Sequence, residues 1–368
     1  MSFNEIKGML GFGCMRMKMD GEEVDYKEFS GMIDMYIAAG FNYFDTAHGY
    51  IDGKSETALK ACLTSRYKRE DYILANKLSE WFFEKEEDIV PLFEKQLEKC
   101  GVDYFDFYLF HAVNRKSYEK LKSVNAFSVV EQLKREGKIR HIAMSFHDSA
   151  DVLDKILSEQ PSIEAVQLQI NYLDYDDPGV QSKACYDVAE KHCKKVIVME
   201  PVKGGRLANL PDEAKEVFDN LGGGSYASYA LRYAASYPNV FMVLSGMGTT
   251  EMMQDNINTF TDFKPLDEKE RAATDKAREI IRRVNMISCT KCNYCADVCP
   301  MNIPISDIFE VYNTVLAAKK TVGEAREMLP ASGGAMSECI KCGKCEEVCP
   351  QSIQIREHIE KISKRMEK

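Results

Sequence analysis

The sequence lacks a long apolar run, and this absence limits where the protein can work. No apolar stretch in its 368 residues approaches the about 18 residues that a membrane span needs, so we expect no membrane partner. The first residues, MSFNEIKGML, also lack the layout of a secretory signal peptide. We therefore expect a cytoplasmic protein, in whose reducing surroundings spaced cysteines bind metals rather than form disulfides.

A surplus of positive charge is missing as well. The chain carries 48 Lys and Arg residues against 58 Asp and Glu residues, a net charge of −10. Broad electrostatic binding of phosphate backbones is therefore excluded, and we expect no nucleic-acid partner. No G-x-G-x-x-G motif follows an early strand, which disfavours an open dinucleotide-binding sheet.

What the first 262 residues do contain is a regular alternation of short apolar runs with amphipathic helical patterns. Several of the runs are apolar throughout, as expected of parallel strands that are buried on both faces. Eight strand–helix pairs over roughly 250 residues fit an α/β fold of the (β/α)₈ TIM-barrel type, while an open doubly wound sheet is the competing interpretation. The predicted strands are 9–15, 42–47, 72–77, 104–111, 139–146, 164–171, 195–201 and 240–246.

The predicted helices and a change of composition set the domain bounds. Helical patterns include 26–40, 87–101 and 118–137, and the last of these ends in basic residues and Gly, as helix C-termini do. We expect a barrel over 1–262, a charged connecting helix over 263–286 and a helix-rich, cysteine-bearing domain over 287–368.

Two cysteine runs dominate the C-terminal domain: CTKCNYCADVCP at 289–300 and CIKCGKCEEVCP at 339–350. Each reads C-x₂-C-x₂-C-x₃-C-P, the pattern in which three thiolates hold one cubane cluster and the fourth reaches the other cluster. Zinc knuckles are the alternative, but zinc has no use for the third and fourth cysteines at this spacing. The predicted ligand sets of the two [4Fe–4S] clusters are Cys289, Cys292, Cys295 and Cys349 for one, and Cys339, Cys342, Cys345 and Cys299 for the other.

The cysteine domain resembles the two-cluster bacterial ferredoxins, and its helical spacer over 304–329 resembles the helical ferredoxin modules that are fused to oxidoreductases. The remaining cysteines of the helical patterns, Cys62, Cys100, Cys185 and Cys193, are interpreted as small core residues.

Titratable residues follow three successive predicted strands. "FDTAHGY" provides Asp45, His48 and Tyr50, "ANK" provides Lys77 and "LFH" provides His111. Since barrel active sites lie at the carboxyl ends of the strands, these side chains should meet at one mouth. We expect the ammonium to lower the pKa of the phenol, the carboxylate to hold the ammonium, and the imidazole to orient a carbonyl group. For His48, which lies between Asp45 and Tyr50, the alternative interpretation is that it only lines the mouth.

These segments resemble the aldo-keto reductase family, whose barrel carries an Asp–Tyr–Lys–His tetrad. By position, the resemblance implies that Asp45, Tyr50, Lys77 and His111 are catalytic, with Tyr50 as general acid and base. The resemblance spans about residues 8–262 and implies an NAD(P)-dependent oxidoreductase that acts on a small carbonyl or alcohol.

The resemblance also implies a site for NADP(H) or NAD(H). Met252 stands where many members of the family have an Arg for the 2′-phosphate, which weakens the case for NADPH over NADH. The implied cofactor-binding residues are Cys14 and Met15 beside the nicotinamide; Ser145 and Gln167 for its carboxamide, with Tyr172 further along; Lys203, Gly204, Gly205 and Arg206 at the pyrophosphate; and Gly246, Thr249, Asp255 and Asn256 near the adenosine.

Hydride moves two electrons at once, whereas [4Fe–4S] clusters pass electrons singly. One hypothesis is an oxidoreductase whose clusters relay electrons to or from a ferredoxin- or flavodoxin-type partner; a flavin that would couple the two is possible, although no motif supports it. The alternatives are a nicotinamide-only reductase with structural clusters and a non-catalytic module for redox sensing or partner binding.

The aromatic segment after Lys77, with Trp81, Phe82 and Phe83, is interpreted either as a lid over the substrate or as packing under the ferredoxin-like domain.

Overall fold

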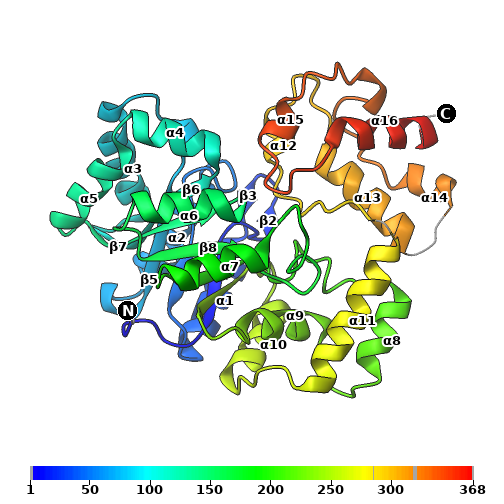
Figure 1. The fold of residues 1–368 in the computed structure, drawn as a ribbon, viewed down its shortest axis with the longest axis horizontal. Coiled ribbons are helices and arrows are strands. Elements are labelled where there is room, and N and C mark those ends of the chain that lie inside the picture. The colour runs from blue at the N-terminus through cyan, green and yellow to red at the C-terminus, as the bar shows by residue number, and fades with distance from the viewer. Residues whose placement is uncertain (1–2, 285, 318–320, 367–368) are drawn as a thin grey trace. The chain divides into compact units, whose positions relative to one another are not determined.

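The structure is a computed structural model that describes residues 3–284, 286–317 and 321–366. By compactness the chain forms two units, shown in Figure 1. The barrel unit comprises Met1–Pro201 and Leu231–Pro265, and the C-terminal unit comprises Val202–Ala230 and Leu266–Lys368. The predicted barrel domain, residues 1–262, includes residues 202–230. In the structure they pack with the C-terminal residues, since α8 (Asp212–Asp219) lies against α11 (Glu268–Val284).

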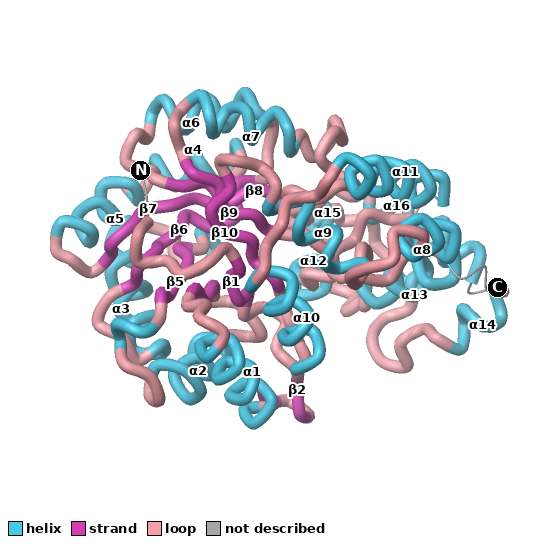
Figure 2. The backbone as a smooth tube through the Cα atoms, turned by 90° about the horizontal axis from the view of Figure 1, so that it is seen from below, coloured by secondary structure: helices cyan, strands magenta, loops and turns pink. Residues whose placement is uncertain are grey.

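Within the described residues of the barrel unit, eight parallel strands close into a barrel, and Figure 2 shows these strands surrounded by helices. Each strand pairs with its neighbours in chain order, and the last closes on the first through Leu10 opposite Val243. The predicted (β/α)₈ architecture is confirmed, with every predicted strand present. The barrel strands are β1 (Leu10–Gly13), β4 (Tyr43–Asp45), β5 (Ile73–Leu78), β6 (Phe105–Val113), β7 (Ile139–Phe146), β8 (Ala165–Gln169), β9 (Lys195–Met199) and β10 (Val240–Ser245).

Helices cover the barrel, and two details differ from the sequence pattern. The predicted helix 118–137 is two helices, because Asn125 adopts a left-handed conformation (φ 51°) that Asn tolerates better than most residues. A short hairpin of β2 (Met19–Asp20) and β3 (Glu23–Val24), which the sequence pattern did not indicate, precedes the first helix. The helices of this unit are α1 (Tyr26–Ala38), α2 (Lys54–Leu59), α3 (Ile89–Cys100), α4 (Arg115–Ser123), α5 (Ala126–Arg135), α6 (Ala150–Glu159), α7 (Ser182–Lys191) and α10 (Thr250–Thr261); α9 (Tyr226–Ala235) spans the boundary of the two units.

The interior of the barrel is filled with apolar side chains, so that it is a packed core and not a pore. Phe3 joins this core at the start of the chain, with its ring 5.1 Å from that of Phe107 and 4.7 Å from that of Phe241. The functional residues therefore have to lie at the ends of the strands or in the loops that follow them.

The C-terminal unit is helical, and the cysteines take part in its core. Cys295 and Cys345 are buried among Ile, Val and Phe side chains, and the other cysteines of the two runs pack against this core or line its pockets. Its helices besides α8 and α11 are α12 (Tyr294–Asp297), α13 (Ile305–Ala317), α14 (Val322–Glu327), α15 (Lys344–Glu347) and α16 (Ile355–Met366). The predicted connecting helix corresponds to α11; residue 285 of that prediction, and 318–320 of the predicted helical spacer, lie outside the described residues. Among the helices that the structure describes, none has the length and apolar character needed to cross a membrane.

Candidate active site and cluster sites

The four predicted tetrad residues lie at the carboxyl ends of three neighbouring strands. Asp45 ends β4, Lys77 is near the end of β5, His111 lies late in β6, and Tyr50 follows β4 in the loop before α2. Since β4, β5 and β6 are adjacent in the barrel, the four side chains share one end of it. All four are buried, and Lys77 is completely inaccessible to solvent.

An ion pair forms the base of the site. Lys77 Nζ lies 2.5 Å from Asp45 Oδ1 and also donates to the Thr46 carbonyl oxygen at 2.8 Å. Burial raises the pKa of Asp45 and lowers that of Lys77, and the attraction between the two charges opposes both shifts. The other oxygen of Asp45, Oδ2, is buried without a hydrogen-bond partner among the described residues.

Tyr50 lies over this ion pair, with Lys77 Nζ 4.7 Å from the centroid of its ring. Burial, and secondly the charge of Asp45, raise the pKa of Tyr50 well above its usual value. The net shift is thus opposite to the lowering expected from the ammonium, because desolvation of the phenolate is its largest cause. With its pKa raised, the phenol keeps its proton at physiological pH.

His111 is held as a neutral imidazole. Its Nδ1 shares a hydrogen bond of 2.6 Å with the hydroxyl of Ser79, a residue that the sequence pattern did not single out. Burial, followed by the charge of Lys77, lowers the pKa of His111 well below its usual value. Its ring is 5.8 Å from that of Tyr50 and 5.0 Å from that of Trp81, so the imidazole lies between the phenol and the aromatic loop.

The aromatic loop divides into exposed and buried residues. Trp81 and Phe82 are 45% and 42% exposed, and Phe82 packs edge-on against His48. Phe83 is buried beneath Lys120 and belongs to the core. The lid over the substrate stays a prediction for Trp81 and Phe82.

His48 belongs to a buried polar chain that supports the loop of Tyr50. Its Nδ1 is 2.8 Å from Oε2 of Glu56. The other oxygen of the same carboxylate, Oε1, accepts a hydrogen bond from the side-chain amide of Asn76. Asn76 in turn accepts from Gln96, and Gln96 accepts from the hydroxyl of Tyr108. The sequence pattern missed these partners, since single polar residues in a helix or strand give no signal of a shared network.

Ser145 and Gln167, the predicted carboxamide ligands, are register partners on β7 and β8. The Ser145 hydroxyl accepts from the backbone N–H of Ala112 at 2.7 Å. Gln167 is buried, and its Oε1 lacks a hydrogen-bond partner among the described residues. A buried acceptor of this kind suits an amide N–H of a ligand. Tyr172, the further predicted contact, is fully buried, and its burial raises its pKa.

At the end of β1, Cys14 is fully buried, and its thiol donates to the Phe12 carbonyl oxygen at 3.4 Å. Burial, followed by the charge of Asp45, raises the pKa of the thiol well above its usual value, so Cys14 is not a reactive thiolate. Met15 is partly buried beside it.

The predicted adenosine residues surround the start of α10. Thr249 is its N-cap, and the side-chain amide of the buried Asn256 donates to Ser245. Gly246 lies against the Arg16 side chain, and Asp255 is partly buried. The carboxylate of Glu28, which the sequence pattern did not reveal, accepts from both the backbone N–H and the hydroxyl of Thr250, at 2.8 and 2.7 Å.

The predicted pyrophosphate loop, residues 203–206, belongs to the C-terminal unit. Lys203 is fully buried and donates to Gln351, and Arg206 donates to the Ile287 carbonyl oxygen at 2.9 Å. Gly204 and Gly205 both have positive φ, and Gly204 packs directly on the backbone of Thr290. Their contact with phosphate stays a prediction, but Lys203 and Arg206 already make hydrogen bonds inside their own unit.

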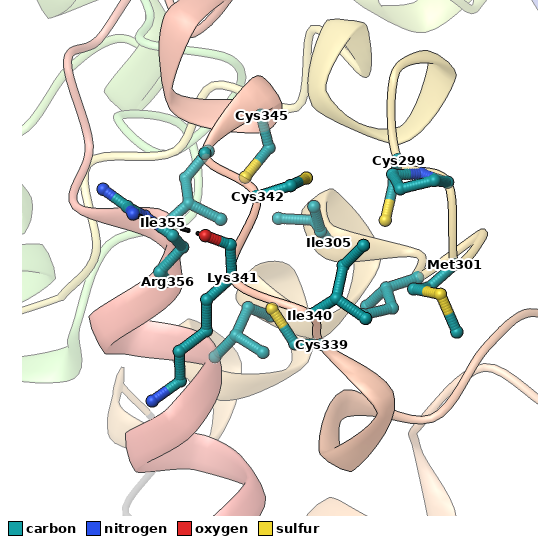
Figure 3. Close-up of a pocket in the computed structure, with 14 residues that line it drawn as sticks. Cys299, Met301, Ile305, Cys339, Ile340, Lys341, Cys342, Cys345, Ile355 and Arg356 are labelled. Carbon is teal, nitrogen blue, oxygen red and sulfur yellow. Dashed lines mark hydrogen bonds between the residues drawn. The ribbon is translucent and has the colours of Figure 1, made fainter.

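The eight cysteines of the two runs line two separate pockets. One pocket is lined by Cys289, Cys292, Cys295 and Cys349. The other is lined by Cys299, Cys339, Cys342 and Cys345, whose sulfurs surround a common space in Figure 3. In each pocket, three cysteines come from one run and the fourth from the other, which is the grouping that the spacing predicts.

Among the described residues, three or more His, Cys, Asp or Glu side chains nowhere gather closely enough to hold a single metal ion. A cubane differs from a single ion because each of its four cysteines binds a different iron, so the sulfurs stay farther apart.

Of the cysteines interpreted as core residues, Cys62, Cys100 and Cys185 are buried. Cys193 is exposed at a left-handed position after α7, so its assignment to the core was wrong.

Two protein-family models match this sequence, one over the barrel and one over the cysteine-bearing region. The Aldo/keto reductase family model matches residues 9–279. The chain belongs to the aldo/keto reductase family. This aldo/keto reductase also matches the 4Fe-4S dicluster domain over residues 288–353, so both predicted resemblances are confirmed.

Relatives extend along most of the barrel. An uncharacterised oxidoreductase of Bacillus subtilis, YqkF, is 23% identical over 310 residues, which cover 75% of this chain and 94% of that protein. The 9,11-endoperoxide prostaglandin H2 reductase of Trypanosoma cruzi is 24% identical and covers 73% of this chain and 87% of its own length. These relatives and the family together support an oxidoreductase, as the sequence predicted.

Solved structures share the barrel. The holo form of an aldo-keto reductase from Bacillus halodurans has a TM-score of 0.60 and 25% identity, covering 73% of this chain and 91% of its own. An aldo/keto reductase from Klebsiella pneumoniae, solved in complex with NADP and acetate, has a TM-score of 0.60 at 19% identity, covering 73% and 90%. At that identity the Klebsiella protein shows the fold alone.

Proposed function

We propose that this aldo/keto reductase interconverts a carbonyl and an alcohol with NADP(H) or NAD(H), and that two [4Fe–4S] clusters pass single electrons to or from a ferredoxin- or flavodoxin-type partner. The observation that carries the catalytic part is the neutral phenol of Tyr50, buried over the Lys77–Asp45 ion pair. A buried proton donor beside a fixed cation is what protonation of a carbonyl oxygen requires.

In the reducing direction, the carbonyl oxygen takes the proton of the Tyr50 hydroxyl while the carbonyl carbon takes a hydride. The phenolate that remains is stabilised by Lys77, whose Nζ is 4.7 Å from the ring, and then regains its proton from water. Asp45 keeps Lys77 in place through the 2.5 Å ion pair. In the oxidising direction the same phenolate removes the proton of the alcohol.

His111 orients the carbonyl. Because Ser79 binds its Nδ1 and burial keeps the ring neutral, the imidazole offers Nε2 as a donor when the Ser79 hydroxyl donates to Nδ1. A neutral donor fixes the carbonyl oxygen without placing a second full charge beside Lys77.

The nicotinamide, when bound, supplies or accepts the hydride. We infer that Gln167 and Ser145 hold its carboxamide, because they are register partners and Gln167 Oε1 is a buried acceptor without a partner among the described residues. Binding would satisfy this acceptor, which otherwise costs about 1–3 kcal/mol when left unpaired.

The clusters would be held by the cysteines of the two pockets and would carry electrons one at a time. Their coupling to hydride transfer then requires a flavin or a substrate that tolerates a one-electron intermediate. The test is anaerobic rapid mixing of the purified protein with NADPH or NADH and a panel of carbonyl compounds, with cluster absorbance recorded. Cluster bleaching or recovery coupled to turnover supports the relay; turnover without any spectral change contradicts it.

A second candidate is a nicotinamide-only reductase in which the clusters are structural. The packing of Cys295 and Cys345 inside the hydrophobic core of the C-terminal unit favours it, because loss of the clusters would leave free thiols in that core. Replacement of pocket cysteines by Ser discriminates the two, since structural clusters leave turnover per folded barrel unchanged.

A further inference from the structure

The duplicated cysteine runs allow a comparison of the two pockets position by position. Thr290 and Ile340 both follow the first cysteine of a run, and Gln351 and Met301 both follow the Cys-Pro at the end of a run. Thr290 is 3% exposed, whereas Ile340 is 62% exposed. The first pocket is therefore covered at Thr290, whereas the equivalent side of the second pocket, at Ile340, is open to solvent.

A loop of the same unit, residues 202–206, packs on the covered side. A Cβ added at Gly204 would lie 2.5 Å from the Thr290 carbonyl oxygen, so the two backbones touch. Next to it, Lys203 is fully buried, and its Nζ donates to Gln351 Oε1 at 3.2 Å. Gln351 itself lines the first pocket, whereas its counterpart Met301 lines the second with an apolar side chain.

The other cations beside the runs are exposed or paired with carboxylates: Arg356, which lines the second pocket, is exposed and forms an ion pair with Glu346. Lys291 and Lys341 occupy equivalent positions, and each forms ion pairs with carboxylates of the following helices. Lys203, by contrast, is fully buried, and its hydrogen bond to Gln351 places it beside the first pocket.

Burial of a cluster has an electrostatic cost, since four thiolates make it anionic and each added electron makes it more so. At the open pocket, water offsets this cost. We propose that at the covered pocket Lys203 takes the place of water and is the buried counter-charge of the cluster held by Cys289, Cys292, Cys295 and Cys349, raising its reduction potential. This inference rests on the proposed binding of two clusters.

The test is potentiometric titration of the intact protein with dithionite as electron source, followed by electron paramagnetic resonance. Each cluster takes up one electron, and the Lys203 ammonium favours the reduced form. Lys203→Met should therefore lower the equilibrium constant for reduction of one cluster by on the order of tenfold. This corresponds to a midpoint potential that is lower by about 59 mV for one electron. Lys203→Arg, which keeps the charge, should stay near the wild-type value.

Two further variants assign and control the effect. In a Cys299→Ser background, which lacks a ligand of the second set, the remaining cluster should show the same response to Lys203→Met. Lys344→Met removes an exposed cation beside Cys345 and should produce a much smaller shift, because water screens it.

Equal midpoint potentials in wild type and Lys203→Met, or an equal shift in Lys344→Met, would overturn the proposal. If Lys203→Met does not retain the first cluster, Lys203→Gln is titrated in its place. Iron analysis of the wild type separates this result from a failure of the proposed function, since a chain that lacks the iron of two cubanes contradicts cluster binding itself.

Discussion

At the scale of single residues, burial is the main influence on the charge state of the predicted catalytic groups. Tyr50 and His111 are pushed toward their neutral forms by desolvation, whereas Asp45 is the largest influence that favours the cationic form of Lys77. The site thus contains a neutral acid, a neutral donor and one fixed ion pair. This combination suits proton donation at neutral pH, and substitutions of its members should separate their roles.

Tyr50→Phe removes the hydroxyl and keeps the ring. We expect kcat for carbonyl reduction to fall by about 10²–10⁴-fold, because the transition state loses its proton donor. Binding of NADPH, measured by fluorescence titration, should be unchanged. Retention of more than a tenth of the wild-type kcat would contradict the role of Tyr50.

His111 makes stability depend on pH. Its folded-state pKa lies well below the unfolded value of about 6.5, so the unfolded chain binds a proton that the folded chain does not. The stabilisation is present above that value and is lost as pH falls below it, by about 1.4 kcal/mol between about pH 7.5 and 5.5.

Urea unfolding followed through Trp81, the single tryptophan of the sequence, measures this loss in the barrel unit. His111→Gln is the control and should show a correspondingly weaker pH dependence. The same dependence in both proteins would assign it to other groups.

Glu28 should influence the choice of dinucleotide. Its carboxylate accepts from Thr250 at the start of α10, beside the predicted adenosine residues, and would repel a 2′-phosphate. We expect Glu28→Gln to lower KM for NADPH more than KM for NADH, as initial-rate measurements with both cofactors would reveal. An equal change of both constants would place the 2′-phosphate elsewhere.

At the scale of elements, the loops differ from the strands in how far the sequence determines them. The strands were predictable because buried parallel strands are apolar throughout. The packing of the loop at 202–206 was not predictable, because its partners Thr290 and Gln351 lie far along the chain and no local sequence pattern indicates the contact. The same holds for Ser79 and for the Glu56 network, which only the folded barrel assembles.

Two neighbouring glycines of this loop form a matched test of that contact. Gly204 and Gly205 both have positive φ, so a Cβ costs about 1–2 kcal/mol of strain at either position. Only at Gly204 would the Cβ also meet the backbone of Thr290, while at Gly205 it meets nothing within 4 Å. We therefore expect Gly204→Ala to destabilise the C-terminal unit by at least about 2 kcal/mol more than Gly205→Ala does.

Thermal release of iron from the C-terminal unit measures this difference. Gly204→Ala should release its iron at a clearly lower temperature than Gly205→Ala. Identical behaviour of the two variants would mean that the loop moves away from Thr290 without loss.

At the scale of the whole molecule, the crossed arrangement of the cysteines would make each proposed cluster depend on both runs. Cys299→Ser should expose Cys339, Cys342 and Cys345 to alkylation by iodoacetamide while the cysteines of the other pocket stay protected. Cys349→Ser should produce the reverse pattern, in which Cys289, Cys292 and Cys295 react. Mass spectrometry of the labelled peptides distinguishes this from an uncrossed arrangement, in which each substitution frees the cysteines of its own run.

The sequence by itself determined the barrel and the family, and it predicted the cysteine grouping and the tetrad, because these depend on periodicity and on short motifs. Only the tertiary structure decided the charge states, since desolvation of Tyr50 and His111 depends on everything packed around them. It also decided that residues 202–230 pack with the C-terminal unit and that Lys203 lies buried beside one cysteine pocket. Contacts between distant segments leave no local pattern in a sequence, and burial is a property of the fold as a whole.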